Sequence, residues 1–243
     1  MAETWRLLHT PDLAPALNMG LDEVLALESS EPTPVLRLYT WEPATLSLGY
    51  FQRFDAVPAA LEAARVVRRI TGGGAIHHAE ELTFSIGAPL EHPLFAGPVG
   101  PSYERIHGII ARALAELGIE AALRGEQSPI ASDREGTGMC FHDSTPLDLC
   151  WGDRKGVGSA QRRTGGRVLH HGSLKVGKDP LEPGVASLVE VGASVAQVGD
   201  LLVRTLAAEL GIALEKGEPT PLELERAGEA GQRYGDPDFV RRR

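Results

Sequence analysis

The sequence predicts an α+β fold, and three observations support this prediction. Runs that alternate apolar and polar residues, which are typical of strands, occur in two groups, one before residue 90 and one after residue 140. Segments with a helical period of apolar residues lie between and after these groups. Few strand–helix–strand units follow one another, which disfavours a doubly wound parallel sheet.

The first half of the chain begins with a predicted helix. Apolar residues recur with a helical period over residues 13–29, and Asp12 is the expected N-cap. We expect Asn18, Asp22 and Glu23 to lie on the solvent side of this helix. The elements predicted after it are strands at PVLRLYTW and ATLSLGYFQ with a Glu42-Pro43 turn between them, a short helix at VPAALEAAR, and strands at AARVV and ELTFSIGA.

A proline- and glycine-rich connection, EHPLFAGPVGPS, leads into the second half. The elements predicted there are a helix over Tyr103–Leu117, strands near Phe141 to Trp151, a hairpin of VGSAQRR and RVLHHGSLKV, a helix over 193–210 closed by Gly211, and a short helix over Pro219–Arg226. Residues 124–139 are polar and glycine-rich, which predicts a mobile loop. The charged tail GDPDFVRRR is expected to fray.

Composition excludes several classes of protein. The hydrophobic content of 42% and the charged content of 23% are ordinary for a globular protein. The two cysteines, Cys140 and Cys150, are too few for a disulfide scaffold and fit a reducing compartment. We find no signal peptide and no apolar run near the ~18 residues of a membrane span, so we expect a cytoplasmic protein without a membrane partner. A net charge of −9 disfavours nucleic-acid binding.

The charge is unevenly distributed. The basic segment Asp153–Lys178 contains seven Lys or Arg residues and one Asp, a local charge of +6 that leaves −15 on the remainder. Such a segment suggests a site for an anionic ligand or an acidic partner, although a solvated surface loop would have the same composition.

Two glycine-rich segments carry the residues with chemical potential. RRITGGGAIHH contains Gly72, Gly73 and Gly74 in a row, which fits backbone that lies directly against a ligand, or a plain hairpin turn. In the second segment, Gly152–Gly172, the charge of Lys155 stands among glycines and could neutralise a phosphate or an oxyanion, unless it is an ordinary turn lysine. The phosphate-loop spacing GxxxxGK[ST] is absent.

The cysteines and histidines were considered for catalysis and metal binding. Cys140, in GTGMCF, is a candidate nucleophile if a nearby cation activates it, and otherwise a small buried hydrophobe. Cys150 has apolar neighbours and is interpreted as structural. His77/His78 and His170/His171 are adjacent pairs without a cysteine at finger spacing, so no metal site is expected.

The two glycine-rich segments together resemble the lipoate–protein ligase and cysteine-dependent octanoyltransferase family, which shares its catalytic fold with biotin protein ligases. RRITGGGAIHH is similar to the family's RR-x-[ST]-GG-x-A-x-x-H loop, and GDRKGVGSAQRR…HHGSL to its GRK-x-x-GSA…HHG-[ST]-L segment. The resemblance extends from SLGYFQ to ASLVEVG. It implies one catalytic domain over residues 1–243, with mixed sheets flanked by helices and no C-terminal accessory domain.

Within this family, SLGYFQ and ELTFS are similar to the octanoyltransferases, which also place a cysteine followed by phenylalanine at about this distance before the lysine. TGGGA, in contrast, is the ligase form. The resemblance implies transfer of an octanoyl group from acyl carrier protein to a lysine of a lipoyl-domain protein, such as the glycine cleavage H protein or an E2 subunit. It implies no cofactor for this reaction.

The resemblance also implies roles for single residues. Cys140 would attack the thioester, and Lys155 with N–H groups of the glycine loop would hold the oxyanion, Lys155 also relaying the proton of the amine. The other residues expected to bind substrate are Arg69, Thr71, Gly72, Gly73, Gly74, His78, Gly158, Ser159, Ala160, His171 and Gly172. For His78 and His171 a proton role is open.

Neighbouring residues are expected to lie away from the site. Arg68 should face outward, and His77 and His170 should point to the opposite face of their strands. The candidate liners of an acyl tunnel, which would equally suit plain core, are Leu46, Leu48, Phe84 and Leu169.

Two alternatives stay open. An ATP-dependent lipoate or octanoate ligase would bind an acyl-adenylate with the glycine loop and Lys155, would need ATP and magnesium, and would leave Cys140 incidental. A non-catalytic acyl- or biotinyl-binding module would keep the fold without turnover. In the transferase, the basic segment could steer docking of acidic partners.

Overall fold

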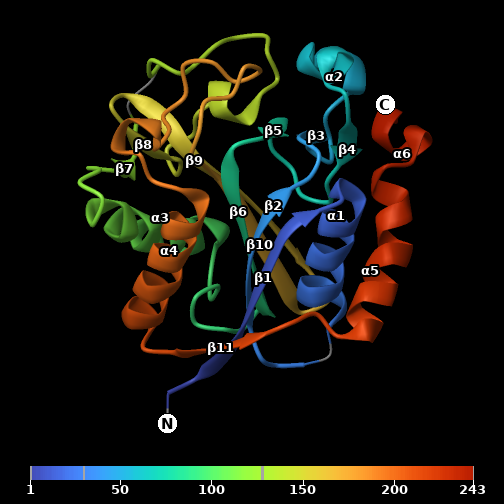
Figure 1. The fold of residues 1–243 in the computed structure, drawn as a ribbon, viewed down its shortest axis with the longest axis vertical. Coiled ribbons are helices and arrows are strands. Elements are labelled where there is room, and N and C mark those ends of the chain that lie inside the picture. The colour runs from blue at the N-terminus through green and yellow to red at the C-terminus, as the bar shows by residue number, and fades with distance from the viewer. Residues whose placement is uncertain (1, 30, 127–128, 243) are drawn as a thin grey trace.

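The computed structural model describes residues 2–29, 31–126 and 129–242. The strands of this part form two sheets (Figure 1). The larger sheet has the strand order β11 (Ala213–Gly217), β1 (Thr4–Leu13), β2 (Val35–Trp41), β6 (Glu81–Pro89), β10 (Arg167–Lys175), β9 (Arg154–Thr164), β8 (Leu149–Trp151) and β7 (Ala122–Leu123). The smaller sheet has the order β4 (Val66–Arg68), β3 (Thr45–Leu48) and β5 (Ile76–His78).

Both sheets mix parallel and antiparallel pairs, which confirms the α+β prediction. In the larger sheet β1 runs parallel to β11 and β2, whereas β2, β6, β10, β9, β8 and β7 pair antiparallel in succession. The predicted hairpin is present as β9 and β10, which pair over most of their length. In the smaller sheet β3 runs parallel to β4 and antiparallel to β5.

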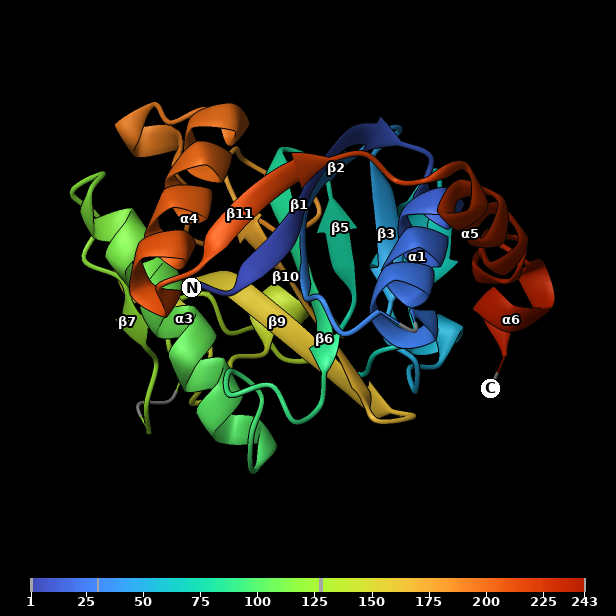
Figure 2. The same cartoon turned by 90° about the horizontal axis from the view of Figure 1, so that it is seen from below.

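The helices cover both faces of the larger sheet. They are α1 (Pro15–Glu23), α2 (Ala59–Glu62), α3 (Val99–Ala115), α4 (Val195–Leu210), α5 (Pro221–Tyr234) and α6 (Pro237–Arg241). Figure 2 shows α3 and α4 on one side of the larger sheet, and α1, α5 and the smaller sheet on the other. The largest apolar core joins α3 and α4 to the sheet, through residues such as Ile106, Leu202 and Phe84. No helix among the described residues is both long and apolar enough for a membrane span.

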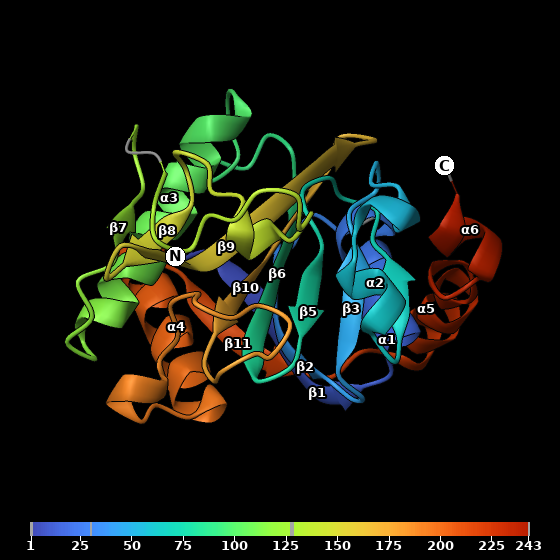
Figure 3. The same ribbon diagram turned by 90° about the horizontal axis from the view of Figure 1, so that it is seen from above.

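The two sheets lie next to each other, and this arrangement positions the site. Figure 3 shows β3 and β5 beside the strands of the larger sheet. The short 3-10 turn Cys140–His142, drawn in yellow-green, lies near β5 and β9. A bridge between Ala75 and Met139 ties this turn to the glycine loop, with the N–H of Cys140 donating to the Ala75 carbonyl at 2.7 Å.

The N-terminal part differs from the prediction in two ways. Strand β1 was not predicted, and the helix begins at Pro15 with Ala14 as N-cap, so Asp12 is not the cap. The prediction of a wet face was also wrong, because Asn18 and Asp22 are buried. Helix α5 packs along α1, and the buried Arg37 guanidinium donates hydrogen bonds to the side chains of both Asn18 and Asp22.

The later segments also depart from the prediction. Helix α3 begins at Val99, inside the predicted connection, and the short helix expected over Pro219–Arg226 extends to Tyr234 as α5. Of Phe141 to Trp151, only Leu149–Trp151 is strand. Among the described residues of 124–139 there is no helix or strand, and residues 127–128 of this predicted loop lie outside the described part.

The prediction that the C-terminal tail frays was wrong. Its residues 237–241 form α6, and Val240 is buried; only Arg243 lies outside the described residues. The Arg68 guanidinium donates to the carbonyls of Phe239 and Val240 at 3.0 and 2.6 Å. The prediction that Arg68 faces outward was therefore wrong, because its side chain is fully buried and fastens the tail to β4.

Candidate functional site

Most of the predicted site residues meet in a narrow cleft between the two sheets, with a volume of about 30 Å³. Its lining comes from β2, β6, β9 and β10 on one side and from β3, β5 and the glycine loop on the other. The lining residues are Met19, Tyr39, Trp41, Ser47, Arg69, Gly73, Ile76, His78, Thr83, Cys140, Gly158, Ser159, Ala160, His171, Gly172 and Ser173. Of the remaining predicted residues, Lys155 contacts Cys140, Thr71 contacts His171, and Gly72 and Gly74 flank Gly73.

Cys140 and Lys155 are in direct contact. The Lys155 ammonium lies 3.4 Å from the Cys140 sulfur and donates to the Cys140 carbonyl at 2.7 Å. Its other partners are the Asp148 carboxylate at 2.8 Å and the Asp143 carbonyl at 3.3 Å. Burial opposes the charge of Lys155, but the Cys140 sulfur and Asp148 raise its pKa above the ordinary value. Lys155 is therefore a fixed cation next to a half-buried sulfur, an arrangement that stabilises a thiolate.

The glycines allow this close approach. A Cβ on Gly74 would lie 2.7 Å from the Cys140 nitrogen, so no other residue fits there without a shift of backbone. A Cβ on Gly158 would lie 3.2 Å from the Cys140 sulfur and 3.1 Å from the Lys155 side chain. Gly73 has a φ of 91°, which disfavours any side chain. The plain hairpin turn does not occur, because β4 and β5, the strands on either side of the loop, each pair with β3 and not with each other.

Arg69 shapes the glycine loop from inside. Its guanidinium donates to the carbonyls of Gly72 and Gly74, both at 2.7 Å, and to the hydroxyl of Thr71 at 3.1 Å. A further N–H reaches the Ser47 carbonyl on β3 at 3.2 Å. These contacts hold the loop against the smaller sheet, because one planar group binds several points of the backbone at once.

His78 lies in a chain of buried hydrogen bonds. Its Nδ1 faces a Glu81 oxygen at 2.6 Å, and its Nε2 faces the Ser47 hydroxyl at 2.8 Å. The ring also stacks on Trp41 with centroids 4.0 Å apart. Burial lowers the pKa of His78, so the neutral ring is favoured. With the Nδ1 proton directed to the carboxylate, Nε2 is left as the acceptor.

His171 lies in a second chain of the same kind. Its Nδ1 faces Asp22 at 3.0 Å, and its Nε2 faces the Thr71 hydroxyl at 2.7 Å. Burial of Asp22 is offset by the hydrogen bond with His171 and by Arg37, and the pKa of this carboxyl is lowered. The cleft thus holds two oriented imidazoles, each fixed by a buried carboxylate from another element.

The residues expected to lie away from the cleft are placed as follows. His77 faces Asp179 at 2.8 Å, and His170 packs against Tyr103 with ring centroids 4.8 Å apart; neither lines the cleft. The tunnel candidates do not line it either, because they lie in apolar clusters; these are Leu46, Leu48, Phe84 and Leu169. Its apolar walls are instead Met19, Tyr39, Trp41 and Ile76.

The basic segment does not form one continuous surface. Lys155, Lys175 and Arg167 are buried, the first two paired with carboxylates and the third bound to main-chain carbonyls. The other four of its seven basic side chains are partly or fully exposed to solvent, so the local charge of +6 overstates the surface charge.

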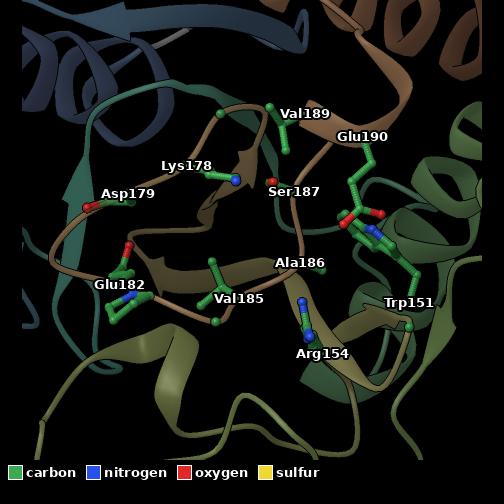
Figure 4. Close-up of a pocket in the computed structure, with 14 residues that line it drawn as sticks. Trp151, Arg154, Lys178, Asp179, Glu182, Val185, Ala186, Ser187, Val189 and Glu190 are labelled. Atoms are coloured by element: carbon green, nitrogen blue, oxygen red, sulfur yellow. The ribbon is translucent and has the colours of Figure 1, made fainter.

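The structure also has a larger cavity of about 540 Å³ (Figure 4). It is lined by Trp151, Arg154 and the segment 177–190, including Lys178, Glu182 and Glu190, but not by Cys140 or the two cleft histidines. We place the candidate site in the small cleft because the candidate nucleophile Cys140, the Lys155 cation and the oriented imidazoles meet there.

Three carboxylates of the site were missed by sequence reasoning: Asp22, Glu81 and Asp148. Asp22 stands at a position where the helical pattern predicts a solvent-exposed side chain. In the structure its side chain is instead buried in an ion pair with Arg37. The available signal was Arg37 itself, a charge inside an apolar strand, which requires a partner. Glu81, a charged residue at the start of the apolar strand ELTFSIGA, gave the same kind of signal. No group of three or more His, Cys, Asp or Glu suited to a metal occurs among the described residues.

Comparison with known proteins gives three consistent results. The family model of the lipoyl protein ligase A/B catalytic domain matches residues 14–216. The Octanoyltransferase LipM of Moorella thermoacetica is 44% identical over 71% of this chain, and the match spans 65% of that protein, slightly less than two thirds. The LipM protein of Kyrpidia tusciae is 35% identical over 96% of both chains.

The solved structures show the same fold. A putative lipoate protein ligase from T. acidophilum superposes with a TM-score of 0.80 at 22% identity, covering 98% of this chain and 99% of that one. A lipoate-protein ligase A bound with ATP superposes with a TM-score of 0.79 at 22% identity, covering 98% of both chains.

Proposed function

Because this chain belongs to the lipoyl protein ligase A/B catalytic-domain family, we propose that it transfers an octanoyl group from acyl carrier protein to a lysine of a lipoyl-domain protein. The relatives of 35% and 44% identity are octanoyltransferases by name, which supports this reaction over ATP-dependent ligation. Cys140 and Lys155 are the catalytic residues, and no cofactor takes part.

In the first step the Cys140 thiolate attacks the thioester carbonyl. A bond forms between the sulfur and the acyl carbon, the bond to the carrier's sulfur breaks, and the carrier leaves as a thiolate that takes up the proton that Cys140 had lost. Lys155 stays charged throughout and stabilises the thiolate and the oxyanion. Its raised pKa favours this role over the proton relay that the family resemblance implied.

In the second step the acceptor lysine, as a free amine, attacks the acyl-enzyme. An amide bond forms, the carbon–sulfur bond breaks, and the amine's proton ends on the Cys140 sulfur. The imidazoles of His78, whose pKa is lowered by burial, and of His171 line the cleft and carry this proton on the way. Glu81 and Asp22 orient the two rings, and each Nε2 exchanges the proton through the hydroxyl that it faces, Ser47 for His78 and Thr71 for His171.

One observation carries the proposal: the Cys140 sulfur lies 3.4 Å from a buried ammonium, in a cleft floored by the two family motifs. An adenylating enzyme would need the Lys155 cation, but the Cys140 sulfur would have no role in its reaction. A binding module needs neither, and it would have no use for two oriented histidines.

The test is a reaction of the protein with octanoyl acyl carrier protein and an apo lipoyl domain in the absence of ATP. We expect an octanoylated lipoyl domain, detected by intact mass, and no product from Cys140→Ala. Product that appears only with free octanoate and ATP would make the protein a ligase, and absence of product under both conditions would leave a binding module.

A further inference from the structure

The mouth of the cleft has a definable rim. Among the lining residues, Gly73 is exposed and Cys140, Ser159 and Ala160 are half-buried, so the cleft opens between the glycine loop and β9. The rim next to this opening consists of Tyr50, Phe51, Arg162 and Arg242, which we call the aromatic rim. The N–H of Tyr50 donates to the Thr71 carbonyl at 2.8 Å, which fastens the rim to the glycine loop.

Phe51 is the most exposed large apolar side chain among the described residues, with 85% of its surface open to solvent. Its ring lies over the glycine loop, 3.8 Å from the point where a Cβ of Gly72 would be. Chain geometry from Gly72 to Gly74 then places the ring at most about 17 Å from the Cα of Cys140. A large aromatic side chain exposed near the mouth of the cleft is of the residue type that anchors protein–protein contacts.

Two arginines extend the aromatic rim. Arg242 lies over the Tyr50 ring at 3.7 Å from its centroid, and Arg162 of β9 lies 5.6 Å from the same centroid. Both donate to main-chain carbonyls, at Tyr50 and Ile70, and neither forms an ion pair within the described part of the chain. Arg242, with Arg162, lowers the pKa of the Tyr50 hydroxyl, which reports positive potential at this edge of an acidic protein.

The proposed reaction limits what can dock here. A lysine side chain reaches only ~6 Å beyond its Cα, so the acceptor backbone must come to the mouth of the cleft. A protein–protein interface of ordinary size covers about 800 Å² per partner, a disc of roughly 16 Å radius. An interface centred on the mouth therefore extends to about the distance of the Phe51 ring, the outer part of the aromatic rim.

From these observations, and resting on the proposed function, we propose that the aromatic rim is the docking surface for the acceptor lipoyl domain, with Phe51 as its apolar anchor. The partner's chemistry follows from the rim: an apolar contact for Phe51 and carboxylates near the target lysine for Arg162 and Arg242. We assign this surface to the acceptor and not to the donor carrier protein.

The test measures binding to the resting enzyme, which requires no turnover. An apo lipoyl domain is titrated by NMR into wild type, Phe51→Ala and the double variant Arg162→Gln/Arg242→Gln. We expect the Kd to rise about tenfold for Phe51→Ala, the effect of a typical interface hot spot. The double variant should also weaken binding and reduce its dependence on salt.

Two matched controls lie on α5, away from the cleft: Leu222→Ala, an exposed apolar residue, and Arg226→Gln, an exposed arginine. Both should leave the Kd unchanged. The rate of acyl-enzyme formation from octanoyl carrier protein is measured on the same proteins and should not change in Phe51→Ala. An unchanged Kd in Phe51→Ala, or slower acylation by the carrier protein, overturns the docking proposal. Wild type that binds the lipoyl domain but never acylates refutes the proposed function instead.

Discussion

Lys155 is charged although it is almost fully buried, because two neighbours outweigh the loss of hydration. The Asp148 carboxylate at 2.8 Å and the Cys140 sulfur at 3.4 Å both favour the ammonium form. An isolated buried charge would be expensive, whereas one that is paired on two sides is tolerated. Lys155 is thereby kept as a permanent positive charge at the sulfur.

Removing this charge should slow the first half-reaction. In Lys155→Ala we expect acyl-enzyme formation to fall by about 100-fold or more, the usual loss when one oxyanion-stabilising group is removed. Rapid-quench sampling followed by intact mass measures the rate. Arg154→Ala, the exposed neighbour on β9, is the matched control and should keep the wild-type rate. A Lys155→Ala protein that acylates as fast as this control would remove Lys155 from the mechanism.

Gly158 is a second residue on which the site geometry depends. In Gly158→Ala the new methyl would press on both the Cys140 sulfur and the Lys155 side chain, so we expect at least tenfold slower acylation with little change in the folded structure. Gly228→Ala on α5, where a Cβ meets nothing within 4 Å, is the control and should raise the unfolding free energy by up to about 1 kcal/mol. Equal acylation rates in both variants would show that the contact at Gly158 does not matter.

Single residues could be found from the sequence where a motif marks them. Cys140, Lys155 and His171 stand in recognisable motifs, and the structure brings them to one cleft. Asp22 and Glu81 stand in no such motif, and their distant partners, His171 for Asp22 and Lys175 for Glu81, are brought to them only by the fold. The same holds for Arg68, whose partners lie at the opposite end of the sequence.

At the scale of elements, strand β10 binds the segment 177–190 through one buried lysine. Lys175 pairs with Glu81 at 2.9 Å, Glu182 at 2.5 Å and Asp179 at 3.4 Å. One cation cannot neutralise three carboxylates, so a proton is favoured on one of them. Burial, together with Asp179 and Glu81, raises the pKa of Glu182 to about 7, against the pull of Lys175.

This raised pKa predicts a pH dependence of stability. Between about pH 4.5 and 7 the folded state keeps the Glu182 proton and the unfolded state releases it, so stability falls as pH rises through this window. Glu182→Gln cannot titrate, and the other groups are common to both proteins. We expect the unfolding free energy of wild type, relative to Glu182→Gln, to decrease by up to about 1.4 kcal/mol per pH unit over the window. Urea denaturation at several pH values measures it, and a difference that does not vary with pH contradicts the assignment.

Elements were predictable where local pattern and tertiary environment agree. The β9–β10 hairpin and helix α4, with Ser194 as N-cap and Gly211 in the left-handed conformation, carry their own signals. Helix α6 does not, because a short polar tail becomes ordered only through Arg68 and the burial of Val240. Strand β1 likewise depends on its parallel partners β2 and β11, which no local pattern reveals.

At the scale of the whole molecule, the candidate site is formed by residues that come from two sheets and lie far apart in the sequence. The larger sheet supplies Lys155 and His171, the smaller one supplies His78, and the turn at Cys140 joins them through the bridge between Ala75 and Met139. The proposed acyl transfer requires all of these parts at one carbonyl carbon. The fold brings them together, and the proposed docking surface for the acceptor, the aromatic rim, lies at the mouth of the same cleft.

The most direct measurement mixes the protein with octanoyl acyl carrier protein alone, without ATP and without acceptor, and follows intact mass with peptide mapping. The account predicts one octanoyl group per chain, located on Cys140 as a thioester that hydroxylamine removes, and none on Cys140→Ser. An unmodified Cys140 under these conditions, or an octanoyl group found on another residue, would contradict covalent transfer through this sulfur.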